Sequence, residues 1–169
     1  MISPGLAQKF PKLVADGAWE TSPTDQAYNC LGWAAARDQT SWWQPGGFTA
    51  TYWPQGVLAD FSFECFVQLF EEAGYEKCTS WNLEVLYEKV ALYAIPGTDE
   101  FTHAAAQLRS GRWTSKLGAF EDITHNSLGA LEGSTAQEYG EVRQILRRRC
   151  CLWGVLARCF FKVVTLIQR

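Results

Sequence analysis

The sequence lacks the histidine and cysteine pattern that holds metal ions. It has two histidines, at positions 103 and 125, and none of its six cysteines stands in a C-x-x-C pair. A structural zinc site needs four such ligands at characteristic spacings, so we expect neither a zinc site nor any other cofactor. The cysteines are therefore expected to be free thiols in a reducing compartment. They are Cys30, Cys65, Cys78, Cys150, Cys151 and Cys159.

A large excess of charge of one sign is also missing. Fifteen Lys and Arg residues stand against 18 Asp and Glu residues, which gives a net charge of −3. This balance provides no basic surface for nucleic acid, and we expect no nucleic-acid partner. Residues 1–20 lack the basic stretch and apolar run that mark a secretory signal, which predicts a cytoplasmic location. The chain contains no internal repeat.

Aromatic residues are, by contrast, abundant. They make up 14% of the 169 residues and include eight tryptophans. Such a content predicts a deep core, an aromatic-walled cleft, or both. The segment 41–56, SWWQPGGFTATYWPQG, is typical of a long ordered loop. Its tryptophans either line a substrate cleft or fill the core. A place in the core is the favoured interpretation for Trp42 and Trp53, whereas both interpretations stay open for Trp43.

Helical and strand patterns succeed one another along the chain. One helix is expected to start at Thr24 or Asp25 and to run to position 38. A second, over 61–75, has apolar residues at helical spacing and ends at Gly74. Residues 1–23 and 119–138 are expected to be mostly irregular. The remaining elements are a short helix or turn over 82–89, a strand over 89–95, a hairpin of 102–108 and 112–118, and a strand or helix over 139–148.

Cys30 is the main candidate for a chemical role. It is expected in the first turns of the first helix, where the helix dipole lowers a thiol pKa and so favours the nucleophilic thiolate. An imidazole partner would stabilise the thiolate and protonate a leaving amine, and His103, at the start of a strand, is one candidate. The alternative is that Cys30 is a small buried hydrophobe and His103 a core or edge histidine.

Several motifs resemble those of an uncharacterised bacterial family of unknown function. They are YNCLGWAA, SWWQPGG, YWPQG, THAAAQLRSGRWTSKLG, DITH, LEG and EYG, and they extend from about residue 19 to residue 147. The family pattern is YNC-x-x-WA, a Trp/Pro-rich loop, TH-x-A-x-Q and GxWxSKLG. A more distant resemblance links the chain to the NlpC-like cell-wall endopeptidases and related amidases of the papain-like superfamily.

The NlpC-like resemblance implies a fold and an order of catalytic residues. The implied fold is α+β and papain-like, with N-terminal helices packed on a small antiparallel sheet over residues 1–149 and an apolar, basic tail over 150–169. Cys30 matches the nucleophile and His103 the base. Ser115 falls at the third position, where His, Asn, Asp or Gln is usual, and a hydroxyl orients an imidazole more weakly than a carboxylate does.

Other residues could complete such a site. Asp122 is the second choice for the orienting residue and His125 the third. The oxyanion hole would use the backbone N–H of Cys30 together with a side-chain donor. The candidates for that donor are Asn29, Gln26 and Tyr28, although Asn29 could instead cap the helix.

These observations predict a cysteine hydrolase or transferase that acts on an amide in a peptide, a protein or another substrate. One alternative is a non-catalytic module that binds a peptide or glycan through the Trp-rich cleft, with Trp43 in its wall. Another is a toxin or effector domain. The tail after Arg147–Arg149 is too short and too charged for a membrane span, but it suits contact with a membrane surface or a protein.

Overall fold

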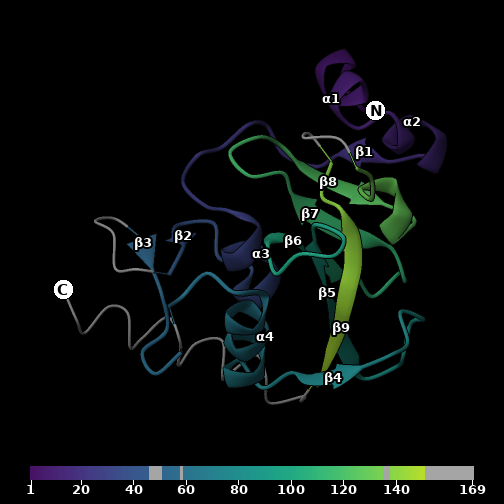
Figure 1. Cartoon of the computed structure of the whole chain (residues 1–169). Helices are drawn as coiled ribbons and strands as arrows, with labels where there is room; N and C mark the ends of the chain where they lie inside the picture. The colour runs from purple at the N-terminus through teal and green to yellow at the C-terminus, as the bar shows by residue number, and fades with distance from the viewer. Residues whose placement is uncertain (46–50, 58, 135–137, 151–169) are drawn as a thin grey trace.

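A seven-stranded β-sheet forms the centre of the computed structural model, which describes residues 1–45, 51–57, 59–134 and 138–150 (Figure 1). Its strands are β1 (Trp19–Glu20), β4 (Glu76–Cys78), β5 (Tyr87–Ala94), β6 (Phe101–Gln107), β7 (Trp113–Lys116), β8 (Asp122–His125) and β9 (Glu141–Arg149). They lie in the order β1-β8-β7-β6-β5-β9-β4, and every neighbouring pair is antiparallel. A separate parallel pair joins β2 (Trp42–Trp43) to β3 (Thr51–Tyr52).

Short helices accompany the sheet in the described part of the chain. They are α1 (Pro4–Lys9), α2 (Lys12–Asp16), α3 (Cys30–Ala36), α4 (Phe63–Glu72) and the single 3-10 turn η1 (Leu128–Ala130). Helix α3 packs against β6 and β7, and α4 lies beside it on the same side of the sheet (Figure 1). Helices α1 and α2 lie at the β1 end, where α2 contacts η1.

The two faces of the sheet bury different cores. Side chains of a strand alternate between the faces, so neighbours in sequence contribute to opposite cores. Leu92 and Ala104 belong to the core under α3 and α4, which we call the helix face. Tyr93 and Ala105 belong to the core under α1, α2 and η1, which we call the opposite face. The central strands are therefore buried on both sides.

Several of the expected elements are confirmed. The second helix runs over Phe63–Glu72, begins after Ser62, whose hydroxyl accepts from the Cys65 N–H at 3.2 Å, and is followed by Gly74 at φ 85°. The hairpin is present as β6 and β7, and the expected strands over 89–95 and 139–148 are β5 and β9. Local patterns of apolar residues and glycine were sufficient to predict these elements.

The predicted papain-like α+β fold is wrong. The described residues form mainly one antiparallel sheet of seven strands, and the longest helix among them has ten residues. The N-terminal helices α1 and α2 have only six and five residues, since Phe10 and Pro11 separate them and Gly17 at φ 73° ends the second. No layer of long N-terminal helices therefore covers the sheet in the described residues.

Three local predictions also differ from the structure. The segment 1–23, expected to be mostly irregular, contains α1, α2 and β1. The first predicted helix begins at Cys30 and not at Thr24 or Asp25, because the Asn29 side chain caps it by accepting from the Gly32 N–H at 3.2 Å. The stretch 119–138, expected to be irregular, contains β8, which pairs with both β7 and β1. The predicted membrane or protein contact of the tail falls almost entirely outside the described residues. Within them, no helix has the length and apolar character needed to cross a membrane.

Candidate functional site

Cys30 lies at the first position of α3 and points into the core of the helix face. Its exposed fraction is 8%, and Ala104 of β6 is part of the same core. Burial raises the pKa of the Cys30 thiol to about 11, an effect that hydrogen bonding to the backbone at Ala104 only partly offsets. The thiol is therefore protonated at neutral pH, which is the reverse of an activated nucleophile.

His103 lies on the opposite face of the sheet. It pairs with Tyr93 across β5 and β6, is fully buried, and stacks on the Tyr139 ring with a centroid separation of 4.1 Å. Neither of its ring nitrogens has a hydrogen-bond partner within the described ranges. Burial lowers the pKa of His103 to about 3, so the ring is neutral at physiological pH.

The sheet thus separates the two residues of the predicted pair. Ala104 faces Cys30, and the alternation along β6 directs its neighbour His103 to the other side. Among the residues that the structure describes, no hydrogen bond links the Cys30 thiol to the imidazole of His103. The arrangement that the cysteine-hydrolase hypothesis requires is not formed in this structure.

Ser115 and His125 lie on the same face as His103 but interact with each other. The Ser115 hydroxyl is 3.0 Å from Nε2 of His125, and Nδ1 of His125 is 2.7 Å from the Ser127 carbonyl oxygen. Because a carbonyl only accepts, Nδ1 donates to Ser127, and the neutral ring accepts the Ser115 proton at Nε2. Burial lowers the pKa of His125 as well. Ser115 therefore orients His125 and not His103.

Asp122 and Tyr28 form a buried pair on the helix face. The Tyr28 hydroxyl donates to Oδ2 of Asp122 at 2.7 Å, while Oδ1 of Asp122 is buried with no partner in the described part. Burial and the neighbouring carboxylate raise the pKa of Tyr28 to about 12. The ammonium of Lys116 lies 4.8 Å from the centre of the Tyr28 ring and donates to the Asp25 carbonyl. Within the described residues, the Asp122 carboxylate therefore makes no hydrogen bond with either histidine.

The remaining predicted oxyanion and cleft residues are structural or exposed. Asn29 caps α3, and its side chain also accepts from the Trp43 N–H and donates to the Trp43 carbonyl. Gln26 is exposed. Trp43 is 5% exposed, lies in the core of the helix face, and donates its indole N–H to Asp38 at 3.0 Å. Of the two interpretations left open for Trp43, a place in the core is therefore the one that the structure shows.

A small pocket of about 240 Å³ lies beside Cys30. Its walls include Asn29, Trp43, Phe66 and Thr102. Among the described residues that line it, Cys30 is the only titratable one. The pocket can hold a small apolar group, but its described walls supply no general base.

A much larger groove lies on the opposite face, where residues of β4, β6, β7 and β9 line it. Its volume is about 780 Å³, within the range of about 300–1,000 Å³ that is typical of ligand pockets. Trp113 and Ile145, both nearly fully buried, contribute to its floor. One rim is the segment 79–83, in which Trp81 is 63% exposed, and the other is the segment 126–129 with Glu132.

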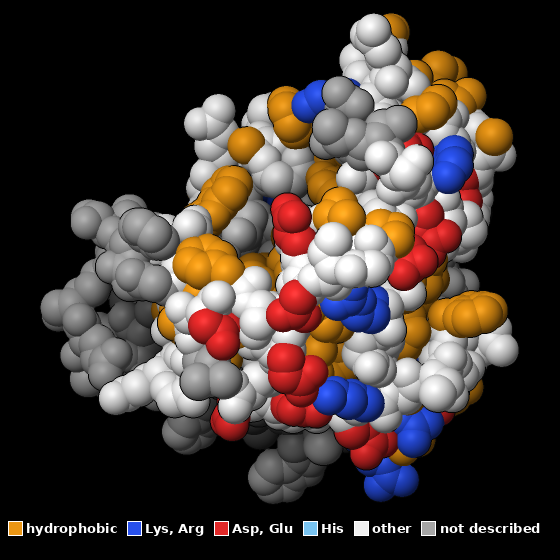
Figure 2. All heavy atoms as spheres, in the orientation of Figure 1, with side chains coloured by type: hydrophobic (Ala, Val, Ile, Leu, Met, Phe, Trp, Pro, Cys, Tyr) orange, Lys and Arg blue, Asp and Glu red, His pale blue; other side chains and the backbone are white. Residues whose placement is uncertain are grey.

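The groove carries little charge. Two charged residues, Glu132 and Arg143, are among its described lining residues. The guanidinium of Arg143 lies over the Phe63 ring at 4.6 Å and donates to the Thr98 carbonyl, so it is directed to the helix face. Glu132 accepts from the Val142 N–H at 3.0 Å. On the side of the molecule drawn in Figure 2, acidic and basic side chains are interleaved, with no broad basic area for a polyanion.

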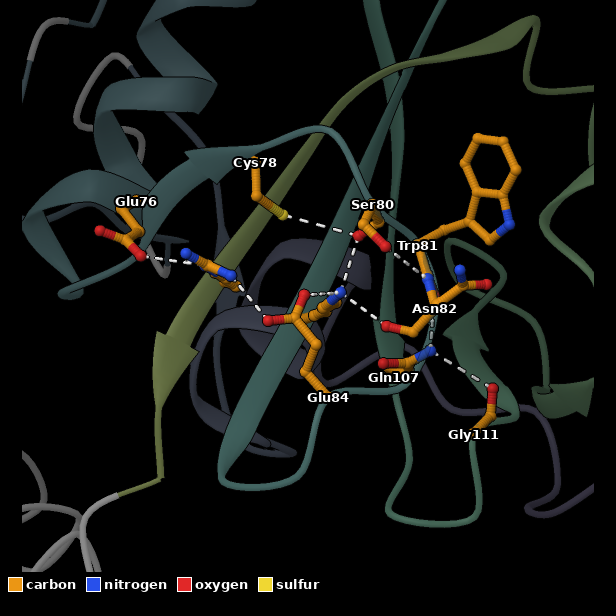
Figure 3. Close-up of polar contacts among 10 residues, drawn as sticks. Glu76, Cys78, Ser80, Trp81, Asn82, Glu84, Gln107 and Gly111 are labelled. Atoms are coloured by element: carbon orange, nitrogen blue, oxygen red, sulfur yellow. Dashed lines mark hydrogen bonds and ion pairs between the residues drawn. The ribbon is translucent and has the colours of Figure 1, made fainter.

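Polar contacts fix the rim that carries Trp81. The ammonium of Lys89, whose side chain is fully buried, donates to the carbonyls of Ser80 at 2.8 Å and Asn82 at 2.6 Å and pairs with Glu84 at 2.5 Å. Gln107 of β6 donates from Nε2 to the Trp81 carbonyl at 2.9 Å. Figure 3 shows this network, with the Trp81 and Asn82 side chains projecting from the rim away from Glu84. The backbone under Trp81 is thereby anchored to two central strands.

The groove was not predicted from the sequence, because the tryptophans of the segment 41–56 indicated a cleft elsewhere. The available signal was Trp81–Asn82, an exposed aromatic residue next to an amide in the connection between two strands. A turn with a tryptophan is a common sign of contact with another molecule, because an indole that serves only the fold is rarely left exposed.

Comparison with known proteins places the chain in a family without a described activity. A family model described as a domain of unknown function, DUF7689, matches residues 19–147. No curated protein and no solved structure matches the chain.

Proposed function

The chain belongs to the DUF7689 family, and from that premise we propose that it is a non-catalytic binding domain whose ligand, a peptide or a glycan, occupies the groove beside Trp81. The observation that carries the proposal is the exposed indole on an anchored rim above an apolar floor. Binding sites gain affinity when aromatic contact residues are fixed before the ligand arrives, since less conformational entropy is lost. Lys89 and Gln107 provide that fixation.

The arrangement of the titratable residues supports binding over chemistry. Catalysis by general acid and base requires a titratable group within reach of the substrate and with a pKa near the working pH. His103 and His125 are both buried on the opposite face, and burial lowers the pKa of each. Cys30 is buried on the helix face with a raised pKa. None of the three is suited to proton transfer at neutral pH.

The test is binding to peptide and glycan arrays by the wild type and two variants. Trp81→Ala removes the exposed indole and is expected to weaken binding strongly, by about tenfold or more. Cys30→Ala alters only the helix-face core and is expected to retain binding. The cleavage products of any bound ligand should be absent by mass spectrometry. Binding that persists in Trp81→Ala but is lost in a folded Cys30→Ala protein would contradict the proposal.

A cysteine hydrolase that uses Cys30 is the second candidate. One observation favours it: Cys30 lines the small pocket beside Trp43 and is therefore within reach of a small group that enters there. The reaction would need a base other than His103, because His103 faces the other core. The alkylation experiment described in the Discussion distinguishes this candidate from the binding domain.

We further propose a reducing, cytoplasmic setting for this function. Cys30 and Cys78 form no disulfide within the described residues. Secreted domains usually pair their cysteines, so free thiols support a reducing compartment. Cell fractionation with an antibody against the chain tests this directly, and recovery in a membrane or extracellular fraction would contradict it.

A further inference from the structure

The polar groups of the groove identify a class of ligand. Asn82 on the rim is exposed, and its amide, which can donate twice and accept twice, has no hydrogen bond within the described ranges. Thr79 on the same rim also has an exposed side chain. On the other rim, Oε1 of Glu132 is held by the Val142 N–H, which leaves Oε2 as an acceptor. Amide, hydroxyl and carboxylate groups of this kind suit a ligand that carries several hydroxyls.

The apolar part of the groove suits a ligand that has a flat apolar face as well as hydroxyls. Trp81 offers the largest exposed ring of the rim, and Leu83 beside it is 48% exposed. A sugar ring presents a flat face of C–H groups and an edge of hydroxyls, so it can cover an indole while its edge reaches polar neighbours. Figure 3 shows Trp81 and Asn82 projecting on the same side of the rim, as this contact requires.

Charge excludes the anionic alternatives. The Arg143 guanidinium is turned away from the groove, which leaves the carboxylate of Glu132 as the charged group of the described lining. A carboxylate next to a ligand disfavours phosphate, sulfate and sialic acid. Lysine and arginine side chains, which would recognise such groups, are absent from the rest of the described lining.

From these observations we infer that the groove binds a neutral saccharide, with a sugar ring stacked on Trp81 and its hydroxyls bonded to Asn82 and Glu132. This inference rests on the proposed binding function and specifies its ligand. An extended peptide suits the groove less well, because peptide recognition by a sheet uses a free strand edge. The two edge strands of the sheet, β1 and β4, have only two and three residues.

The experiment is a glycan array that carries neutral, sialylated and sulfated glycans, run beside a peptide array. The affinity of the strongest neutral glycan is then measured by isothermal titration calorimetry. Trp81→Ala is expected to weaken binding by about tenfold or more, because a stacked tryptophan is typically the dominant contact of a site. Trp81→Phe retains a ring and is expected to recover part of the affinity.

Val85→Ala is the matched control. Val85 is on the same connection, is 84% exposed and does not line the groove, so its truncation should leave the affinity unchanged. Binding to anionic glycans alone, or to peptides alone, would overturn the saccharide inference and leave the proposed binding function standing. Absence of binding on both arrays would overturn both.

Discussion

Burial of the Cys30 thiol determines how the residue reacts. With a pKa of about 11, only a small fraction of the thiol is ionised at pH 7. We predict that iodoacetamide alkylates Cys30 in the folded protein more slowly than in the urea-unfolded chain. The rate should rise about tenfold for each pH unit up to about pH 11, as long as the protein stays folded.

Peptide mass spectrometry after timed labelling gives the rate at Cys30 separately from the other cysteines. The unfolded chain is the internal standard for an unperturbed thiol. Alkylation of Cys30 at pH 7 that is faster than in the unfolded chain would support the cysteine-hydrolase candidate against the binding domain.

His103 is expected to destabilise the fold in acid. Its pKa is lowered to about 3 from an ordinary value of 6.5, so the folded state binds its proton less readily than the unfolded state does. The neutral His103 ring therefore carries no penalty above pH 6.5. As the pH falls from 6.5 toward 3, the free energy of unfolding decreases by up to about 5 kcal/mol because of this group. Replacement by Phe keeps a ring against Tyr139 and removes the titration.

We therefore predict that His103→Phe loses less stability than the wild type between pH 7 and pH 4, as measured by urea unfolding at each pH. His125→Phe is compared with the wild type at pH 7 only, because it removes a second histidine whose pKa burial lowers and leaves Ser115 and the Ser127 carbonyl without their partner. That variant should be less stable than the wild type by about 1–3 kcal/mol at pH 7. An unchanged acid dependence in His103→Phe would show that the ring is not buried as described.

At the scale of the element, Lys89 holds the backbone of the rim segment 79–83 in place. Lys89→Met removes the donor to the Ser80 and Asn82 carbonyls and the partner of Glu84. We predict a loss of about 1–3 kcal/mol in the free energy of unfolding, together with faster amide exchange across residues 79–86. Lys77→Met, which removes an exposed ion pair with Glu64, should cost less than about 1 kcal/mol. Equal effects of the two substitutions would contradict an anchoring role for Lys89.

Close packing at Gly32 joins α3 to the segment that carries Trp43. A Cβ at this position would lie 2.9 Å from Cδ1 of Trp43 and 3.0 Å from the Ser41 carbonyl oxygen. We predict that Gly32→Ala destabilises the fold by about 1–3 kcal/mol in thermal or urea unfolding. Gly5→Ala in α1 has no atom within 4 Å of the added Cβ and should be neutral or stabilising. A neutral Gly32→Ala would show that α3 and β2 are not in contact as described.

Elements with a strong local signal could be predicted from the sequence. The apolar spacing of α4, the glycine after it and the hairpin of β6 and β7 all follow from patterns within about ten residues. The start of α3 was misplaced because Asp25 and Asn29 are both good caps, and only the contacts of Asn29 with Trp43 decide between them.

At the scale of the whole molecule, the sequence could not assign His103 and Cys30 to opposite cores. Strand β6 is buried on both sides, so THAAAQ shows no contrast between an apolar and a polar face. The strand would be buried equally well with His103 on either face of the sheet. Which face His103 takes depends on how α3 packs on the sheet. The groove could not be predicted for a similar reason, because it forms between segments 79–83 and 126–132, which are distant in sequence.

The central claim, that the ligand occupies the groove beside Trp81, is most directly tested by NMR of the tryptophan indoles. The ¹⁵N-labelled protein is titrated with the strongest neutral glycan from the array, and the indole signals are assigned with Trp→Phe variants. We predict that the Trp81 and Trp113 signals shift while those of Trp33 and Trp43 stay in place. Shifts at Trp43 without a shift at Trp81 would instead locate the ligand beside Cys30 and contradict a site beside Trp81.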